Sequence, residues 1–260
     1  NSGKTLMFYD FSNAIVRQPC RRVSDGLREG VEKPRYGYVK AEHQNYVELL
    51  KALGLKVYEL KPDDNFPDSM FVEDPAFTLA NFAVLLNPGA ETREGEKDLI
   101  KDTLKELFST FLTVDEGTVE GGDVLILEKE VLIGLSSRTN FDGASALQAI
   151  LCDQGYESRI VETPKNVLHL KSECSALDEE TILATPRIAF CGLFNQYNVI
   201  LTHKNEFVAA NSLRINDKLL VPNSCPHTAD QLSKRFDIEF VKVSEVAKID
   251  AGLSCMSLRW

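Results

Sequence analysis

Three side-chain types in this chain can together carry out nucleophilic catalysis: a cysteine, a histidine and a glutamate. Cys255 offers a thiolate nucleophile, His169 can transfer protons, and Glu120 can orient and charge the histidine. Most proteins of this size contain all three types, so their presence alone predicts no site. A lone cysteine is usually a small buried apolar residue and a lone histidine a satisfied core residue, and both remain alternatives here.

The spacing of the polar residues is more informative than their types. Four polar positions recur at intervals of 47, 49 and 42 residues: Glu73 with Asp74, Glu120, His169 and Asn211. Each position lies on or beside the first apolar stretch of a repeated pattern, so related units would bring them to one axis. Cys255 follows the last unit in the tract KIDAGLSC, where a glycine-containing turn would return the chain toward that axis.

The repeated pattern is a pair of short apolar stretches, an amphipathic helix and another short strand. It recurs with a period of about 50 residues, which predicts five units. Helices are expected at 38–53, 94–108, 143–151, 228–236 and in a short segment opening at Pro186. Strands or apolar stretches are expected at 13–16, 56–60, 82–86, 111–114, 124–127, 131–135, 158–161, 168–176, 181–184, 199–202, 207–215, 218–221 and 239–243.

Such units cannot bury their apolar faces alone, so the pattern predicts an α/β fold of five modules around a common axis. The competing interpretation is a doubly wound parallel sheet. Tight hairpins, together with the absence of G-x-G-x-x-G and G-x-x-x-x-G-K-[ST], argue against the nucleotide-binding versions of that sheet.

The composition argues against several classes of protein. Among 260 residues, 29 Lys and Arg face 39 Asp and Glu, and the net charge of −10 comes without the basic cluster of a nucleic-acid binder. No apolar stretch approaches the roughly 18 to 20 residues that a membrane-spanning helix needs. The six cysteines show neither C-x-x-C nor paired-histidine spacing, so we expect no metal, reduced thiols and a cytoplasmic location.

Six tracts carry a family resemblance: FPDSMFVEDPA (66–76), NPGAETREGE (87–96), TVEGGDVL (118–125), SSRTNFDGA (136–144), VLHLK (167–171) and KIDAGLSCMSLRW (248–260). In this order they closely resemble dimethylarginine dimethylaminohydrolase, above all its bacterial form. The resemblance runs from about Asn13 to the C-terminus. It implies the pentein fold, a five-bladed α/β propeller of ββαβ units with pseudo-fivefold symmetry. We therefore expect one catalytic domain over residues 1–260, with residues 1–9 a tag or flexible terminus.

The resemblance implies a hydrolase that cleaves N-ω-methylated arginines to citrulline and dimethylamine or methylamine. It makes Cys255 the nucleophile that forms a covalent S-alkylthiouronium, His169 the general acid and base, and Glu120 the carboxylate bonded to that histidine. A thiolate beside an imidazolium suits a guanidinium, which is a poor electrophile with a poor leaving group. No cofactor and no metal are implied.

Seven further residues match positions at which the family contacts its substrate. They are Leu27 in a lid, Asp68 at the α-amino group, Glu73 and Asp74 at the guanidinium, Arg93 and Arg138 at the α-carboxylate, and the backbone carbonyl of Ile249 at the amino group. Acidic groups for the cationic ends and arginines for the carboxylate specify a zwitterionic guanidino amino acid. The alternatives are turn-forming acidic residues and solvated surface arginines.

Two other functions stay open on the sequence. An arginine deiminase-like hydrolase of unmethylated arginine shares the chemistry, although deiminases tend to carry an aspartate just after the catalytic histidine, where this chain has Leu170-Lys171. The other is a non-catalytic binder of arginine-like ligands. The expected partner is a small-molecule substrate, with neither nucleic acid nor membrane, and a homodimer is left open because relatives occur as monomers and dimers.

Overall fold

The computed structural model describes residues 7–260, so the expectation of a tag or flexible terminus at residues 1–9 lies largely outside the described residues. Its strands are β1 (Asn13–Arg17), β2 (Lys56–Leu60), β3 (Ala76–Leu79), β4 (Phe82–Leu85), β5 (Thr110–Thr113), β6 (Val124–Ile126), β7 (Val131–Leu135), β8 (Ser158–Glu162), β9 (Cys174–Ala176), β10 (Thr181–Ala184), β11 (Asn198–Leu201), β12 (Leu213–Ile215), β13 (Lys218–Pro222), β14 (Asp237–Val241) and β15 (Leu258–Arg259). Its α-helices are α1 (Tyr36–Ala52), α2 (Glu96–Leu107), α3 (Phe141–Asp153), α4 (Leu170–Glu173), α5 (Pro186–Ala189) and α6 (Pro226–Leu232).

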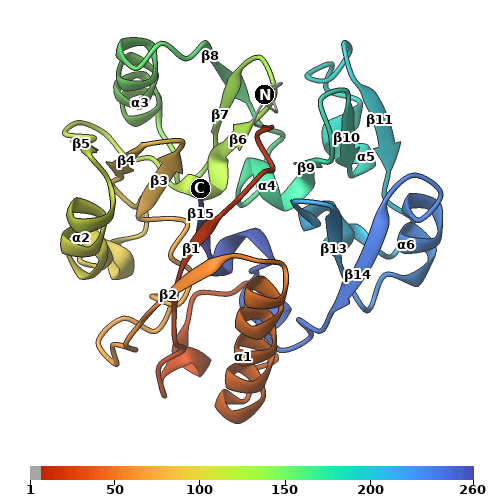
Figure 1. Cartoon of the computed structure of the whole chain (residues 1–260), viewed down its shortest axis with the longest axis horizontal. Helices are drawn as coiled ribbons and strands as arrows, with labels where there is room; N and C mark the ends of the chain where they lie inside the picture. Colours follow the sequence, from red (N-terminus) through yellow and green to blue (C-terminus); the bar gives the residue numbers. More distant parts are fainter. Residues whose placement is uncertain (1–6) are drawn as a thin grey trace, which may run out of the picture.

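The strands form five three-stranded sheets arranged around a central axis (Figure 1). In β3-β4-β5 an antiparallel hairpin is followed by a helix and a parallel strand, and β6-β7-β8, β9-β10-β11 and β12-β13-β14 repeat this order. The short α4 lies near the axis, whereas α1, α2, α3 and α6 lie toward the outer edge (Figure 1). The expected five-bladed α/β propeller of ββαβ units is confirmed.

The remaining blade joins the two ends of the chain. β15 pairs antiparallel with β1, with Ile15 opposite Leu258, and β2 pairs parallel with β1 on its other side. The repeat pattern did not predict β15, because two residues are too few to show a period. The C-terminal strand therefore closes the ring, and it directly follows the segment that carries Cys255.

The apolar core lies between neighbouring blades. In β10, Ile182 and Ala184 pack in a cluster shared with the blade β6-β7-β8, whereas Leu183 packs in a cluster shared with the blade β12-β13-β14. The middle strand of a blade is thus buried on both faces, which explains why these strands are continuous apolar runs instead of alternating ones. Each blade depends on both neighbours for its core.

Most expected elements are present with ends shifted by a few residues. The strands expected at 56–60, 131–135 and 181–184 coincide with β2, β7 and β10, and Gly54 follows α1 with φ +91°, as a helix C-terminal glycine does. The apolar stretches at 168–176 and 207–215 are each divided into a helical turn and a short strand. No helix within residues 7–260 combines the length and apolar character needed to cross a membrane.

Candidate active site

A cavity of about 240 Å³, hereafter the main cavity, brings together most of the residues singled out in the sequence. It is lined by Leu27, Asp68, Asp74, Arg93, Arg138, His169, Ile249 and Cys255. Glu120 and Glu73 do not line this cavity. Glu120 is bonded to His169, and the Glu73 side chain is bonded to Lys171. Residues spread over more than 200 positions of sequence thus converge, and of the regularly spaced positions Asp74 and His169 line the cavity.

The convergence follows from where each residue stands in its blade. Glu120 directly precedes the short 3₁₀ helix η3 (Gly121–Asp123), His169 precedes α4, and Asn211 ends the 3₁₀ helix η4 (Phe207–Asn211). Each of these positions comes just before the first strand of a blade. Cys255 lies in the 3₁₀ turn η6 (Ser254–Met256), which leads into β15.

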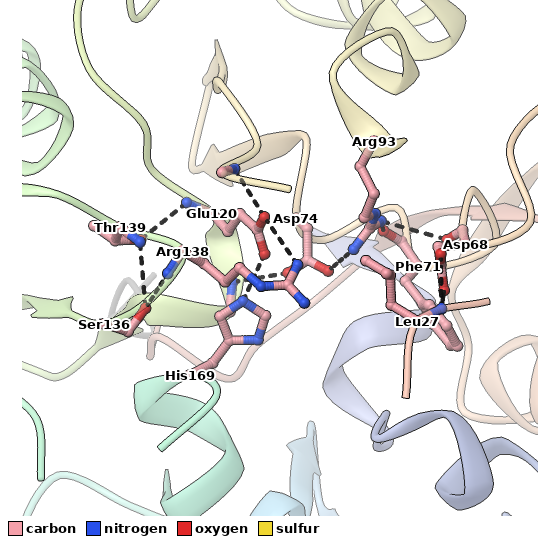
Figure 2. A network of polar contacts seen from close by, with 12 residues as sticks. Leu27, Asp68, Phe71, Asp74, Arg93, Glu120, Ser136, Arg138, Thr139 and His169 are labelled. Atoms are coloured by element: carbon pink, nitrogen blue, oxygen red, sulfur yellow. Dashed lines mark hydrogen bonds and ion pairs between the residues drawn. The ribbon is translucent and has the colours of Figure 1, made fainter. Parts of the chain in front are cut away.

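Glu120 and His169 form a buried pair at the core of the site. Glu120 Oε2 lies 2.6 Å from His169 Nε2, and its Oε1 accepts the Gly89 N–H at 2.9 Å (Figure 2). Arg138 Nη1 lies 3.5 Å from the same Oε1. Because Nε2 faces the carboxylate, the opposite edge of the imidazole is the one that can serve a ligand.

The acidic surroundings of His169 favour its protonated form. Burial by itself would lower the pKa of the imidazole, but the charges of Asp74 and Asp123 and the hydrogen bond with Glu120 outweigh it and raise the pKa to about 9. At neutral pH the residue is therefore an imidazolium, which can donate a proton to a leaving amine.

Asp123 holds His169 in place through the main chain. Its Oδ1 accepts the Leu170 N–H at 2.8 Å, and its Oδ2 accepts hydroxyl protons from Ser136 at 2.6 Å and Thr139 at 2.7 Å. Burial raises the pKa of Asp123, although His169 and these hydrogen bonds oppose the rise. Sequence reasoning missed this residue, although it stands three positions after Glu120 in the tract TVEGGDVL.

The Cys255 thiol lies at the wall of the main cavity, among groups that favour its neutral form. Burial, reinforced by the negative charges of Glu73 and Asp74, raises its pKa to about 12. The Gly252 N–H donates to Sγ at 3.5 Å. A positive charge placed beside Asp74 would counteract both carboxylates and favour the thiolate.

Arg93 is buried and bonded chiefly to carboxylates. Its Nη1 donates to Asp74 at 2.5 Å (Figure 2). Its Nε and Nη2 donate to Glu96 at 3.0 and 2.6 Å, and Nη2 also donates to the main-chain carbonyls of Asp68 and Phe71. Arg93 and His169 hold the pKa of Asp74 below its usual value, against the effect of burial. Arg93, which was expected to bind the α-carboxylate of the substrate, thus holds Asp74 in place at the wall of the cavity.

The segment that covers the main cavity is held by two carboxylates. The Leu27 N–H donates to both oxygens of Asp68 at 3.1 Å, and the Glu29 N–H donates to Asp250 Oδ2 at 2.6 Å. Asp250 has a left-handed backbone, with φ 53°. Leu27, which the resemblance placed in a lid, thus lines the main cavity and is attached to Asp68, and Asp250 is a second attachment that the sequence did not suggest.

Glu73 does not line the main cavity, although it was expected to contact the substrate. Its carboxylate accepts hydrogen bonds from Lys171 Nζ at 2.5 Å, Ser254 Oγ at 2.8 Å and Arg259 Nη2 at 3.3 Å. Its main-chain N–H donates to the Cys255 carbonyl at 3.3 Å. The side chain therefore supports the turn that carries the nucleophile.

Asn211, the last of the regularly spaced positions, belongs to the same support. Its Nδ2 donates to the Lys171 carbonyl at 2.8 Å and to Ser254 Oγ at 3.0 Å, and its Oδ1 accepts the Ser254 N–H at 2.9 Å. The spacing correctly predicted that this residue lies near the axis, where it braces the catalytic turn from beneath.

The structure contains one group of side chains with metal-binding geometry within residues 7–260. Asp74, Glu120 and His169 each offer one atom that could bind a metal ion, and these three atoms lie within 4.8 Å of one another. In the structure Asp74 is bonded to Arg93, and Glu120 is bonded to His169 itself.

The comparisons with known proteins agree on a family. The family model for N,N dimethylarginine dimethylhydrolase, eukaryotic, matches residues 33–190. The N(G),N(G)-dimethylarginine dimethylaminohydrolase of Pseudomonas aeruginosa is 35% identical over 254 residues, which cover 96% of this chain and 100% of the relative. The chain belongs to the dimethylarginine dimethylaminohydrolase family. The N(G),N(G)-dimethylarginine dimethylaminohydrolase of Streptomyces coelicolor is 32% identical to this chain, over 95% of this chain and 96% of the relative.

Solved structures of dimethylarginine dimethylaminohydrolases superimpose closely on this chain. A cysteine-to-serine variant of the Pseudomonas aeruginosa enzyme complexed with citrulline matches with a TM-score of 0.94 and 34% identity, covering 97% of this chain and 100% of that one. A histidine-to-glycine variant in an adduct with S-methyl-L-thiocitrulline matches with a TM-score of 0.93, 34% identity and coverage of 96% and 100%. The N-terminal domain of a cyanobacterial arginine dihydrolase shares the fold at 17% identity, with a TM-score of 0.84 and coverage of 96% and 97%.

Proposed function

We propose that this protein is a dimethylarginine dimethylaminohydrolase, which cleaves asymmetric dimethylarginine and monomethylarginine to citrulline and an alkylamine. In this proposal residues 1–260 act as a single catalytic domain on a small-molecule substrate, without a cofactor. The observation that carries it is one cavity that holds the Cys255 thiol and an imidazolium paired with Glu120. A cytoplasmic location belongs to the proposal, because the cysteines are free thiols that suit a reducing compartment.

The charges of the main cavity support binding of a zwitterionic guanidino amino acid. Asp74 accepts N–H groups of the substrate guanidinium, and Asp68 and the Ile249 carbonyl accept the α-ammonium. Arg138 donates to the α-carboxylate, with Arg93 beside it. Arg138 Nη1 also lies 3.5 Å from Glu120 Oε1, which links the carboxylate-binding arginine to the Glu120–His169 pair.

Substrate binding also activates the nucleophile. The bound guanidinium is a cation placed among the carboxylates that raise the pKa of Cys255, so it lowers that pKa and the thiol releases its proton to water. The thiolate attacks the central guanidinium carbon, forming a C–S bond and a tetrahedral adduct.

His169 then completes the first half of the reaction. It donates its proton to the methylated nitrogen, the C–N bond breaks, and the neutral amine leaves with the bonding electron pair. Cys255 retains a cationic S-alkylthiouronium. The now neutral His169 accepts a proton from a water that attacks the same carbon, and collapse of this second adduct expels the thiolate and releases citrulline.

One contact supports a methylated substrate over arginine. Lys171, two residues after His169, is bonded through Nζ to Glu73. Leu170 and Lys171 therefore offer no carboxylate that could bind a second unsubstituted guanidinium nitrogen. An arginine deiminase would need such a carboxylate, so this contact favours a methylated substrate.

Turnover by a Cys255→Ser variant tests the function. Purified wild-type protein should form citrulline from asymmetric dimethylarginine and monomethylarginine, faster than from arginine or agmatine. Cys255→Ser should lose turnover while ligands still raise its melting temperature, and Cys152→Ser, at an exposed cysteine, should behave as wild type. A preference for arginine would overturn the substrate assignment, and citrulline formation by Cys255→Ser would overturn the nucleophile.

A further inference from the structure

A second cavity is also lined by Cys255. It also measures about 240 Å³, and we call it the side cavity. Residues outside the main cavity that line it are Asn166, Ser172, Glu173, Arg187, Val208, Asn211, Ala247 and Gly252. No step of the reaction described above uses this space.

The two cavities share a wall that includes the nucleophile. Glu29, Leu168, Asp250, Ala251 and Cys255 line both of them. Leu168 adjoins the proton donor His169 in sequence, and Asp250 holds the lid through the Glu29 N–H at 2.6 Å. A group released from the carbon bound to Cys255 therefore lies at the border of the side cavity.

The charges of the two cavities differ in a way that sorts the reaction partners. The main cavity is lined by as many cationic as anionic side chains: Arg28, Arg93, Arg138 and the His169 imidazolium against Glu29, Asp68, Asp74 and Asp250. The side cavity shares Glu29 and Asp250 and adds Glu173, whereas its one arginine is Arg187, which forms an ion pair with Glu173, so carboxylates outnumber cations there. The side cavity therefore favours a small cation over an anion.

The chemistry creates such a cation before the rest of the substrate can leave. A dialkylamine, like the lysine side chain with its pKa of about 10.4, is protonated in neutral water. Once the C–N bond breaks, the amine is free, while the remainder stays covalently attached to Cys255 beneath a lid held by Asp68 and Asp250. Leu27 does not line the side cavity, so an exit through that cavity would let the amine leave at this stage while Leu27 stays in place.

We propose that the side cavity receives and releases the alkylamine leaving group while the lid remains closed over the S-alkylthiouronium. This inference rests on the proposed function. The amine departs as a neutral molecule carrying the proton from His169 and takes up a second proton from water in the side cavity. The space that it leaves admits the water that hydrolyses the intermediate.

A substitution that narrows the side cavity tests the proposal without touching the catalytic groups. Val208, on η4, lines the side cavity and not the main one. Val208→Trp should slow release of a larger amine more than that of a smaller one. We expect turnover of dimethylarginine to fall about tenfold and that of monomethylarginine about threefold, with the covalent intermediate accumulating in acid-quenched samples.

The matched control is Val208→Thr, which replaces one methyl group by a hydroxyl of similar size at a partly exposed position, and it should turn over both substrates within about twofold of wild type. Ala247→Leu narrows the same cavity from η5 (Val246–Ile249) and replaces Val208→Trp if that variant does not fold. Equal losses for the two substrates, or no loss in a folded narrowed variant, would show that the amine leaves past the lid and would overturn the proposal. Wild-type protein that forms no citrulline would instead overturn the function itself.

Discussion

Removing the negative charge of Glu120 should shift the pH range in which His169 acts as an acid. Glu120→Gln keeps the shape of the side chain and an oxygen that can accept the Gly89 N–H, but it ends the ionic contact with His169 at 2.6 Å. Both partners are buried, so solvent does not screen the contact.

The size of the shift follows from the strength of that contact. A hydrogen bond to a charged group contributes about 1.5 to 3 kcal/mol, which corresponds to about 1 to 2 pKa units. The pKa of His169, raised to about 9 in the wild type, should therefore fall by that amount. At pH 8.5 a fall of about 1.5 units would lower the protonated fraction roughly eightfold.

The measurement is the pH dependence of kcat/KM, which reports ionisations of the free enzyme. Its basic limb should move to lower pH in Glu120→Gln, and a nuclear magnetic resonance titration of His169, one of only four histidines, should show the same displacement. Glu130→Gln, which removes a more exposed carboxylate paired with Arg159, is the control and should leave the profile unchanged. A basic limb that stays in place in Glu120→Gln would refute the contribution assigned to Glu120, beside those of Asp74 and Asp123, in raising the pKa of His169.

Two further predictions concern the surroundings of the imidazole. Gly122→Ala should lower kcat at least about a hundredfold, because a Cβ there would lie 2.6 Å from the His169 ring, whereas Gly37→Ala meets open space and should be fully active; equal kcat values would contradict this. His169→Asn should reduce the pH dependence of stability. A raised histidine pKa stabilises the fold fully below about pH 6.5, and this contribution is lost as pH rises through about 9. The stability advantage of wild type over His169→Asn, measured by urea denaturation, should thus shrink by roughly 3 kcal/mol between pH 6 and pH 10, and a constant difference would exclude the idea.

Much of the propeller was predictable because its signals are local. Apolar runs in the middle strands and amphipathic helices gave the positions of β2, β7 and β10 and of the helices to within a few residues. The divided stretches at 168–176 and 207–215 were not predictable, because a single helical turn beside the axis has no periodicity to detect. Their helical turns are stabilised by contacts with other blades, such as the bond from Leu170 N–H to Asp123.

The candidate site was predictable as a set of residues but not as a set of contacts. Glu73 and Asp74 are adjacent in sequence, yet Asp74 lines the main cavity and Glu73 is bonded to Ser254 and Lys171 beneath the catalytic turn. Side chains of neighbouring residues on a turn diverge, so one motif supplies one residue to the cavity and one to its support. Asp123 was missed for the same reason, since its role depends on which main-chain donor it faces.

The sequence by itself determined the number of units, the family and the residue types that can perform the chemistry, because each of these follows from local pattern or from ordered motifs. Only the tertiary structure decided the closure of the ring by β15, the neutral state of the Cys255 thiol, the imidazolium of His169 and the presence of a side cavity. These properties depend on burial and on charges from several blades. The sum of such distant contributions exists only once the five blades have packed together.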